Sequence, residues 1–242
     1  MSVGHHRGEA KGSVELHQVL GEADTAKLLT LKRSVNCEHD IAYGGGISVD
    51  GLTVYVDHTL RDEVIDGHVY VRGMTPSQIL AAWTKRHEPG EWAVEMGDNP
   101  SDTYQSSHGF ATAFEEQFVS TLGINIERYE ECIKPGLTRC LKRFISLGNK
   151  ARPPTNLWCG PYLDEPDKDD IEILRIMRAR GVKDAFKQSK GAVHYGMGEN
   201  ECRACAMFGD RDIHQDIRYC DAVSGLVRKN RWCQLWTPRK GK

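Results

Sequence analysis

Residues Ile47–Asp57 read Ile-Ser-Val-Asp-Gly-Leu-Thr-Val-Tyr-Val-Asp and give the first strong local signal along the chain. β-Branched and aromatic residues, which favour strands, stand on both sides of Asp50-Gly51. An Asp-Gly pair between two such runs is typical of a hairpin with a type I′ turn. The sequence therefore predicts a β-hairpin here, and the extended stretch His68–Arg72 is predicted to join the same small sheet.

The sequence after this hairpin is predicted to be mainly helical. Thr75 and Gln78, three residues apart, form a capping-box pattern, and Pro76 stands at the first helical position. Pro89-Gly90 is predicted to break or kink this helix, and Pro135-Gly136 to separate two later ones. The later helices are predicted at about 106–122, 126–133, 137–147 and 169–180.

These elements predict an α+β protein in which a small hairpin sheet with helices is followed by a compact, loop-rich domain that binds a metal cluster. Four parts are expected along the chain. They are a flexible N-terminal arm with a short helix near Ala23–Lys32 (residues 1–36), an α+β domain (37–152), a linker with a helix (153–192) and the loop-rich domain (193–242).

Composition excludes some classes of function. The 242 residues include 32 Lys and Arg and 34 Asp and Glu, so the formal net charge is −2 and there is no strong nucleic-acid signal. No apolar run approaches the roughly 18 residues that would span a membrane. The polar N-terminus lacks the apolar stretch of a signal peptide, so we expect a protein that is not secreted by that route and works without a membrane.

Four of the eight cysteines lie near the C-terminus, as Cys202-x2-Cys205-x14-Cys220-x12-Cys233. Four thiolates can bind a tetrahedral zinc ion or an iron–sulfur cluster, and disulfides are the weaker alternative without an export signal. Cys220 and Cys233 each stand alone, which favours a larger cluster whose corners are reached separately. The aromatic residues Phe208, Trp232 and Trp236 supply an apolar cover of the kind that tunes such a cluster.

The segment Tyr195–Trp236 resembles the high-potential iron–sulfur proteins, which hold one [4Fe–4S] cluster with cysteines in this order and a Trp-Cys pair at the fourth ligand. The resemblance implies a domain like theirs at 193–242 and a role in electron transfer. It implies that Trp232 packs against the cluster and that the ligands are Cys202, Cys205, Cys220 and Cys233.

The same region also resembles uncharacterised proteins of bacteriophages and prophages, through Tyr195-Gly196-Met197-Gly198 and the residues around the cysteines. This resemblance implies a virion or assembly component that uses the cluster structurally or for redox chemistry. Its partners would be other phage structural proteins, and its location the bacterial host cytoplasm or the virion.

A second group of candidate ligands lies in His87-Glu88-Pro89-Gly90-Glu91. On a helix, His87 and Glu91 are four residues apart and project from one face, so both can bind one zinc ion while Glu88 activates a bound water. His108, which opens the next predicted helix, supplies a third ligand. Solvated charges at a helix end, or a metal bound without catalysis, are the alternatives.

The stretch Thr75–Val119 resembles the zincin metallopeptidases, whose own motif ends in His where this chain has Glu91. The resemblance implies a zincin-like domain at 37–152, with Glu88 as the catalytic residue and zinc as a second cofactor. The expected function is thus a phage or prophage protein that binds a [4Fe–4S] cluster. The alternatives are a zinc-dependent metallopeptidase and an electron-transfer protein.

Overall fold

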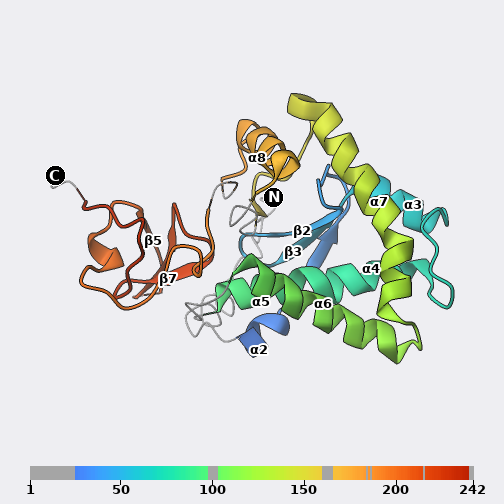
Figure 1. Ribbon diagram of the computed structural model, residues 1–242, viewed down its shortest axis with the longest axis horizontal. Coiled ribbons are helices and arrows are strands. Elements are labelled where there is room, and N and C mark those ends of the chain that lie inside the picture. The colour runs from blue at the N-terminus through green and yellow to red at the C-terminus, as the bar shows by residue number, and fades with distance from the viewer. Residues whose placement is uncertain are drawn as a thin grey trace, which may run out of the picture.

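The computed structural model describes residues 25–97, 103–159, 166–183, 185, 187–214 and 216–239, with only the backbone of 210–214. Helices are combined with two small sheets, so the fold class is α+β, as predicted. Figure 1 shows a sheet near the centre with helices around it and the C-terminal unit on one side. The first 24 residues of the predicted arm lie outside the described residues.

The predicted hairpin is present as β2 (Gly45–Ser48) and β3 (Thr53–Val56), which pair antiparallel. Ile47 lies opposite Val54, which is the register that a turn centred on Asp50-Gly51 produces. The predicted type I′ turn is wrong, because that turn needs a positive φ at both central residues and only Gly51, at 71°, has one. The Asp50 side chain instead accepts hydrogen bonds from the Leu52 N–H and the Ser48 hydroxyl.

Two segments from distant parts of the chain complete this sheet, in the order β1-β3-β2-β4. β1 (Ser34–Asn36) runs parallel to β3, and β4 (Leu157–Trp158) runs antiparallel to β2. The prediction that His68–Arg72 is a strand is wrong, because β1 and β4 occupy both edges of the hairpin. Val69 and Val71, within that stretch, are buried in a core with helical residues.

One continuous helical segment crosses the molecule beside the sheet (Figure 1). It consists of α4 (Pro76–Ala82), the π-helical turn η1 (Trp83–His87) and α5 (Glu88–Met96), and Thr75 and Gln78 form the predicted capping box. The predicted break at Pro89-Gly90 is absent. The wide π turn, in which the Glu88 N–H donates to the Trp83 carbonyl, precedes the proline and relieves the clash of its ring with a preceding carbonyl.

Two long helices pack against this segment. α6 (Tyr104–Thr121) begins two residues before its predicted start, because Thr103 and Ser106 form its capping box. α7 (Ile126–Leu147) is a single helix where two were predicted, and it contains Pro135. Gly136 explains part of this tolerance, since a Cβ there would lie 2.8 Å from Leu60, so the glycine allows close packing that offsets the lost hydrogen bond.

The remaining helices are short. α3 (His58–Ile65) starts at the N-cap Asp57, whose carboxylate accepts from the N–H groups of Thr59 and Leu60. α2 (Thr25–Leu29) lies within the predicted short helix of the arm, and η2 (Gly148–Lys150) follows α7. α8 (Lys168–Ala179) matches the helix predicted after the double proline, with Asp167 as its N-cap. None of the described helices is both long enough and apolar enough to cross a membrane.

The segments predicted as arm and linker contribute to the packed interior. Leu157 of β4 and three residues of α8, Ile173, Ile176 and Met177, belong to the first core, where they pack with Tyr55 of β3 and Phe144 of α7. Leu28 of α2 is buried in another core. Successive side chains of a strand point to opposite faces, so Val54, the neighbour of Tyr55, lies in that other core. In that core Trp92 of α5 packs with two residues of the C-terminal unit, Ile217 and Leu226.

The C-terminal unit has its own small sheet, in the order β5-β6-β7. β5 (Phe208–His214), β6 (Ile217–Cys220) and β7 (Leu226–Arg228) are antiparallel, and a single 3₁₀ turn, η3, spans Cys202–Ala204. Lys190 joins this unit to the rest of the protein: its buried ammonium donates to the carbonyls of Glu95 and Gly97 at the C-terminal end of α5.

Candidate metal centres

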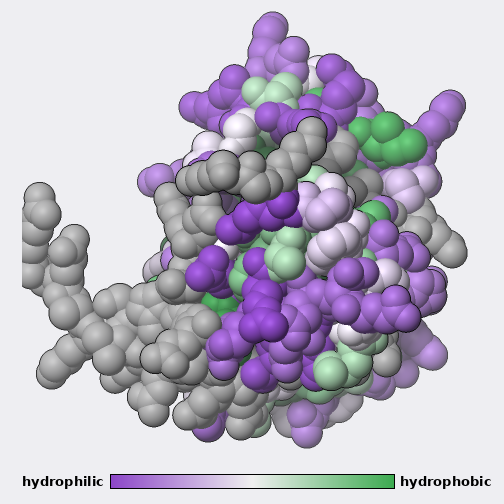
Figure 2. Space-filling view, turned by 90° about the vertical axis from the view of Figure 1, so that its left-hand side faces the viewer, coloured by the Kyte–Doolittle hydropathy of each residue, from purple (hydrophilic) through white to green (hydrophobic). Residues whose placement is uncertain are grey.

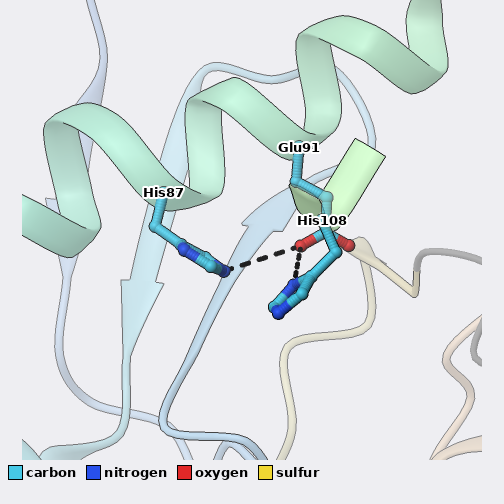
Figure 3. A group of neighbouring side chains, drawn as sticks. All are labelled: His87, Glu91 and His108. Atoms are coloured by element: carbon cyan, nitrogen blue, oxygen red, sulfur yellow. Dashed lines mark ion pairs between the residues drawn. The ribbon is translucent and has the colours of Figure 1, made fainter. Parts of the chain in front are cut away.

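The first candidate centre is formed by His87, Glu91 and His108, and it brings together the three ligands predicted from the sequence (Figure 3). The Nε2 atom of His87 lies 3.8 Å from the Oε2 atom of Glu91, and the Nδ1 atom of His108 lies 3.6 Å from that same oxygen. Each residue offers a ligand atom within 4.8 Å of the other two. Two imidazoles and one carboxylate form a donor set that suits zinc or iron(II).

Local structure explains why these side chains converge. The π turn ends at His87, and α5 continues without a break, so His87 and Glu91 share one face of the helical segment. His108 lies in the second turn of α6, which packs beside α5 and approaches closely at Gly90, where a Cβ would lie 3.3 Å from the Cα atom of Ala111. The His108 ring also stacks on Tyr104, with their centroids 5.3 Å apart.

Two buried atoms of this centre lack hydrogen-bond partners among the described residues, namely the Oε1 atom of Glu91 and the Nδ1 atom of His108. An unsatisfied buried polar atom is costly, and a cation bound between the three residues would remove that cost for the Nδ1 atom of His108. This observation, independent of the sequence motif, indicates that the three residues fit a metal ion.

Glu88 lies beside the centre against β2, where a Cβ added to Gly45 would be 2.2 Å from its Oε1 atom. Burial raises the pKa of Glu88 to about 8, with the charge of His87 opposing this rise and those of Glu91 and Glu115 adding to it. A carboxyl group with a pKa near neutrality is suited to transfer protons, which is the role predicted for this residue.

A pocket of about 450 Å³ opens beside these residues. Its walls combine apolar and aromatic side chains, including Trp83, Tyr104 and Leu137, with polar groups of α7 such as Glu130 and Lys134. Pockets of this size and mixed lining are typical of sites for small ligands or for one or two residues of a chain. The centre therefore has open space in which a substrate can reach a metal.

The second candidate centre is formed by the four C-terminal cysteines. Cys202 begins η3, Cys205 is its C-cap, Cys220 ends β6, and Cys233 lies in the last described segment. All four are buried in one core and line one small cavity. The apolar residues around them include Tyr195, Phe208, Val223, Val227 and Trp236, so the predicted cover at Phe208 and Trp236 is present.

The sulfur atoms of this centre are spaced widely. Among the described residues, the only groups of three ligand atoms within 4.8 Å of one another are His87–Glu91–His108 and Asp40–Asp57–His58, so no three of these sulfurs lie that close. Four thiolates on one zinc ion, at Zn–S distances of about 2.3 Å, would lie about 3.8 Å apart. At least some of these sulfurs therefore lie farther apart than the ligands of one tetrahedral zinc ion.

The electrostatics of the cysteines combine burial, which disfavours a thiolate, with hydrogen bonds that favour one. Burial raises the pKa of Cys202 to about 12, and the nearby thiols of Cys233, Cys220 and Cys205 add to this rise. Backbone N–H groups act in the opposite direction: Ala222 donates to the sulfur of Cys220 at 3.4 Å, and Thr237 donates to that of Cys205 at 3.5 Å. Such N–H donors stabilise a thiolate, and a bound metal cation would stabilise it further.

Figure 2 views the molecule from the side on which the C-terminal unit lies, and its coloured surface there is mostly hydrophilic. The cysteines lie beneath this surface, because each of the four is buried. Trp232 is only partly buried, but it packs within the unit, because a Cβ on Gly198 would lie 2.9 Å from its side chain.

The third group, Asp40, Asp57 and His58, already has a partner. Arg143 donates to Asp40 at 2.8 Å and to Asp57 at 2.7 Å, and Asp57 also caps α3. The group is therefore a structural ion-pair network that ties α7 to the start of α3.

Sequence reasoning missed three residues of the first centre. Glu115 contacts His87, Tyr129 contacts Glu115, and Gly45 makes room for Glu88. The first two lie on separate helices, and no motif links them to His87.

A comparison of the chain with protein-family models, curated proteins and solved structures gives no match.

Proposed function

We propose that this protein binds a [4Fe–4S] cluster through Cys202, Cys205, Cys220 and Cys233, as the resemblance to the high-potential iron–sulfur proteins implies. The observation that carries the proposal is the convergence of four buried thiols, from separate segments, with no three sulfurs within 4.8 Å of one another. Bound there, a cluster supplies one-electron chemistry and cross-links the loops that carry its ligands.

The surrounding residues support this proposal. The apolar core keeps water from the cysteines, and a cluster's potential depends on such exclusion and on N–H donors to its sulfurs. A unit of this size has a small core, so ligation contributes to its folding. The phage origin and the phage structural partners implied by the second resemblance stay predictions.

The test is metal analysis with a visible spectrum of anaerobically purified full-length protein. The expected result is a brown protein that absorbs broadly near ~400 nm and carries about four irons per chain. Cys132→Ser is the matched control, because Cys132 lies on α7 away from this cavity, and it should keep the spectrum. Colourless protein with one zinc ion at these cysteines, after preparation with iron supplied, would overturn the proposal.

A second candidate function is metal-dependent hydrolysis in the pocket beside α5. It is favoured by the His87–Glu91–His108 group, the two unsatisfied atoms there and the proximity of Glu88. His87, Glu91 and His108 would hold a zinc ion, which polarises a carbonyl and lowers the pKa of bound water. Glu88 would accept the proton of that water, and the pocket would admit a peptide end or another small acyl compound.

The corresponding test pairs two substitutions. Glu88→Gln should abolish hydrolysis of a set of fluorogenic peptides while zinc content stays the same, because it removes the base and keeps the ligands. His87→Ala/His108→Ala should lower zinc content by one ion per chain. Equal zinc content in that double variant and in the wild type would exclude the site.

A further inference from the structure

The two histidines of the first centre are held in different ways. The Nδ1 atom of His87 lies 3.0 Å from the Oε2 atom of Glu115, whereas the buried Nδ1 atom of His108 has no hydrogen-bond partner among the described residues. The ring of His87 is therefore held through its Nδ1 atom, on the edge that faces away from Glu91. His108, by contrast, is kept in place by ring contacts with Tyr104 and with His87, whose centroid is 5.0 Å away.

Glu115 is itself held by a third helix. The Tyr129 hydroxyl donates to the Oε1 atom of Glu115 at 2.6 Å, and both side chains are buried. Each oxygen of the carboxylate thus has one partner, Tyr129 on α7 and His87 at the end of η1. These two contacts hold the carboxylate between Tyr129 and His87.

This arrangement determines which nitrogen of His87 can bind a cation. A carboxylate oxygen accepts hydrogen bonds, so the Nδ1 atom of His87 must carry the hydrogen that it donates to Glu115. The lone pair of a neutral imidazole then lies on Nε2, the atom that faces Glu91 at 3.8 Å. The negative charge of Glu115 also makes that nitrogen a stronger donor to a metal.

We propose that Glu115, oriented by Tyr129, is a positioning residue that presents the Nε2 atom of His87 to a divalent cation and is not itself a ligand. The inference rests on the metal site proposed for the pocket. It divides the acidic residues near the centre into one ligand, Glu91, one proton acceptor, Glu88, and one group that acts through His87.

The experiment measures Zn²⁺ affinity of the full-length chain by competition with a chromophoric chelator. Binding that persists in His87→Ala/His108→Ala belongs to the cysteines and is subtracted. We expect Glu115→Gln to weaken binding at the pocket by about 10–100-fold and Tyr129→Phe to weaken it less. Glu116→Gln is the matched control, since Glu116 is the exposed neighbour of Glu115 on α6, and its affinity should equal that of the wild type.

A spectroscopic readout separates positioning from a general structural effect. In the zinc-loaded wild type, nitrogen NMR should find the metal on Nε2 of His87 and the hydrogen on Nδ1. In Glu115→Gln this preference should weaken. The thermal midpoint of this variant without metal should stay close to that of the metal-free wild type. Wild-type affinity in Glu115→Gln, or an equal loss in Glu116→Gln, overturns the inference. A wild type whose zinc binding matches that of the double-alanine variant overturns the metal site itself.

Discussion

The two candidate centres of this protein differ in how their ligands are carried and in what reaches them. The cysteines come from loops and strand ends, and they are enclosed by apolar side chains. His87, Glu91 and His108 come from rigid helices and border a pocket of about 450 Å³. Closed thiolate sites are typical of structural or electron-transfer metals, whereas catalytic metals keep an open position. On the two proposals made above, one protein would combine both kinds of site.

The largest expected effect tests the enclosed centre. Cys220→Ser should remove the cluster and destabilise the C-terminal unit, because the ligand is buried and ligation supplies folding energy. Iron content, absorbance near ~400 nm and limited proteolysis measure this loss. The first centre should still bind zinc in this variant. Loss of zinc binding at the pocket would mean that the two centres do not behave as separate sites.

The connection between the two regions is tested by Lys190→Met. This substitution removes the buried ammonium that donates hydrogen bonds to the carbonyls of Glu95 and Gly97. We expect a loss of about 2–3 kcal/mol in the free energy of unfolding, measured in urea. Lys183→Met, at an exposed position, should change the free energy by less than about 0.5 kcal/mol. Equal stability of both variants would contradict a role for Lys190 in joining the regions.

The protonation of the cysteines predicts a pH dependence that only the cluster-free protein should show. Burial and neighbouring thiols raise the pKa of Cys202 from 9.0 to about 12. Below pH 9 both the folded and the unfolded chain keep this proton, so the stabilising contribution is complete. Above pH 9 the unfolded chain releases it first, and the contribution is lost as the pH rises toward about 12.

Urea unfolding at several values between pH 8 and 11 measures this slope. In Cys202→Ser the slope should decrease. In the cluster-loaded protein the loss above pH 9 should disappear, and below pH 9 stability should rise with pH, because the ligated sulfurs carry no protons while the unfolded thiols still do. The same slope with and without the cluster would count against ligation by Cys202.

The smallest effect concerns the open centre. Gly45→Ala places a Cβ 2.2 Å from the Oε1 atom of Glu88, so that carboxyl must move, while the three ligands stay in place. We expect unchanged zinc content and a loss of stability of about 1 kcal/mol or less. Gly109→Ala is the control with the opposite sign, because Gly109 lies in α6 with nothing within 4 Å of an added Cβ, and it should stabilise the helix by up to about 1 kcal/mol. Reduced zinc content in Gly45→Ala would show that Glu88 supports the ligands directly.

Local signals in the sequence predicted much of the secondary structure. The hairpin register follows Asp50-Gly51, and the capping box at Thr75 starts α4 as expected. These features depend on neighbouring residues alone. Where a break or kink was predicted at Pro89-Gly90, the helix continues through a π turn just before the proline. The separation predicted at Pro135 is wrong, and close packing at Gly136 accompanies that proline.

The sequence by itself determined which side chains form each candidate centre: the cysteine spacing and the i, i+4 relation of His87 and Glu91 are properties of the chain. Only the tertiary structure decided the rest. It placed β1 and β4 at the edges of the hairpin and set the distances between the cysteine sulfurs. It also placed Glu115 against His87 and Tyr129 against Glu115. The contacts of Glu115 with His87 and with Tyr129 join residues 28 and 14 positions apart. They arise from the packing of whole helices and not from any local pattern.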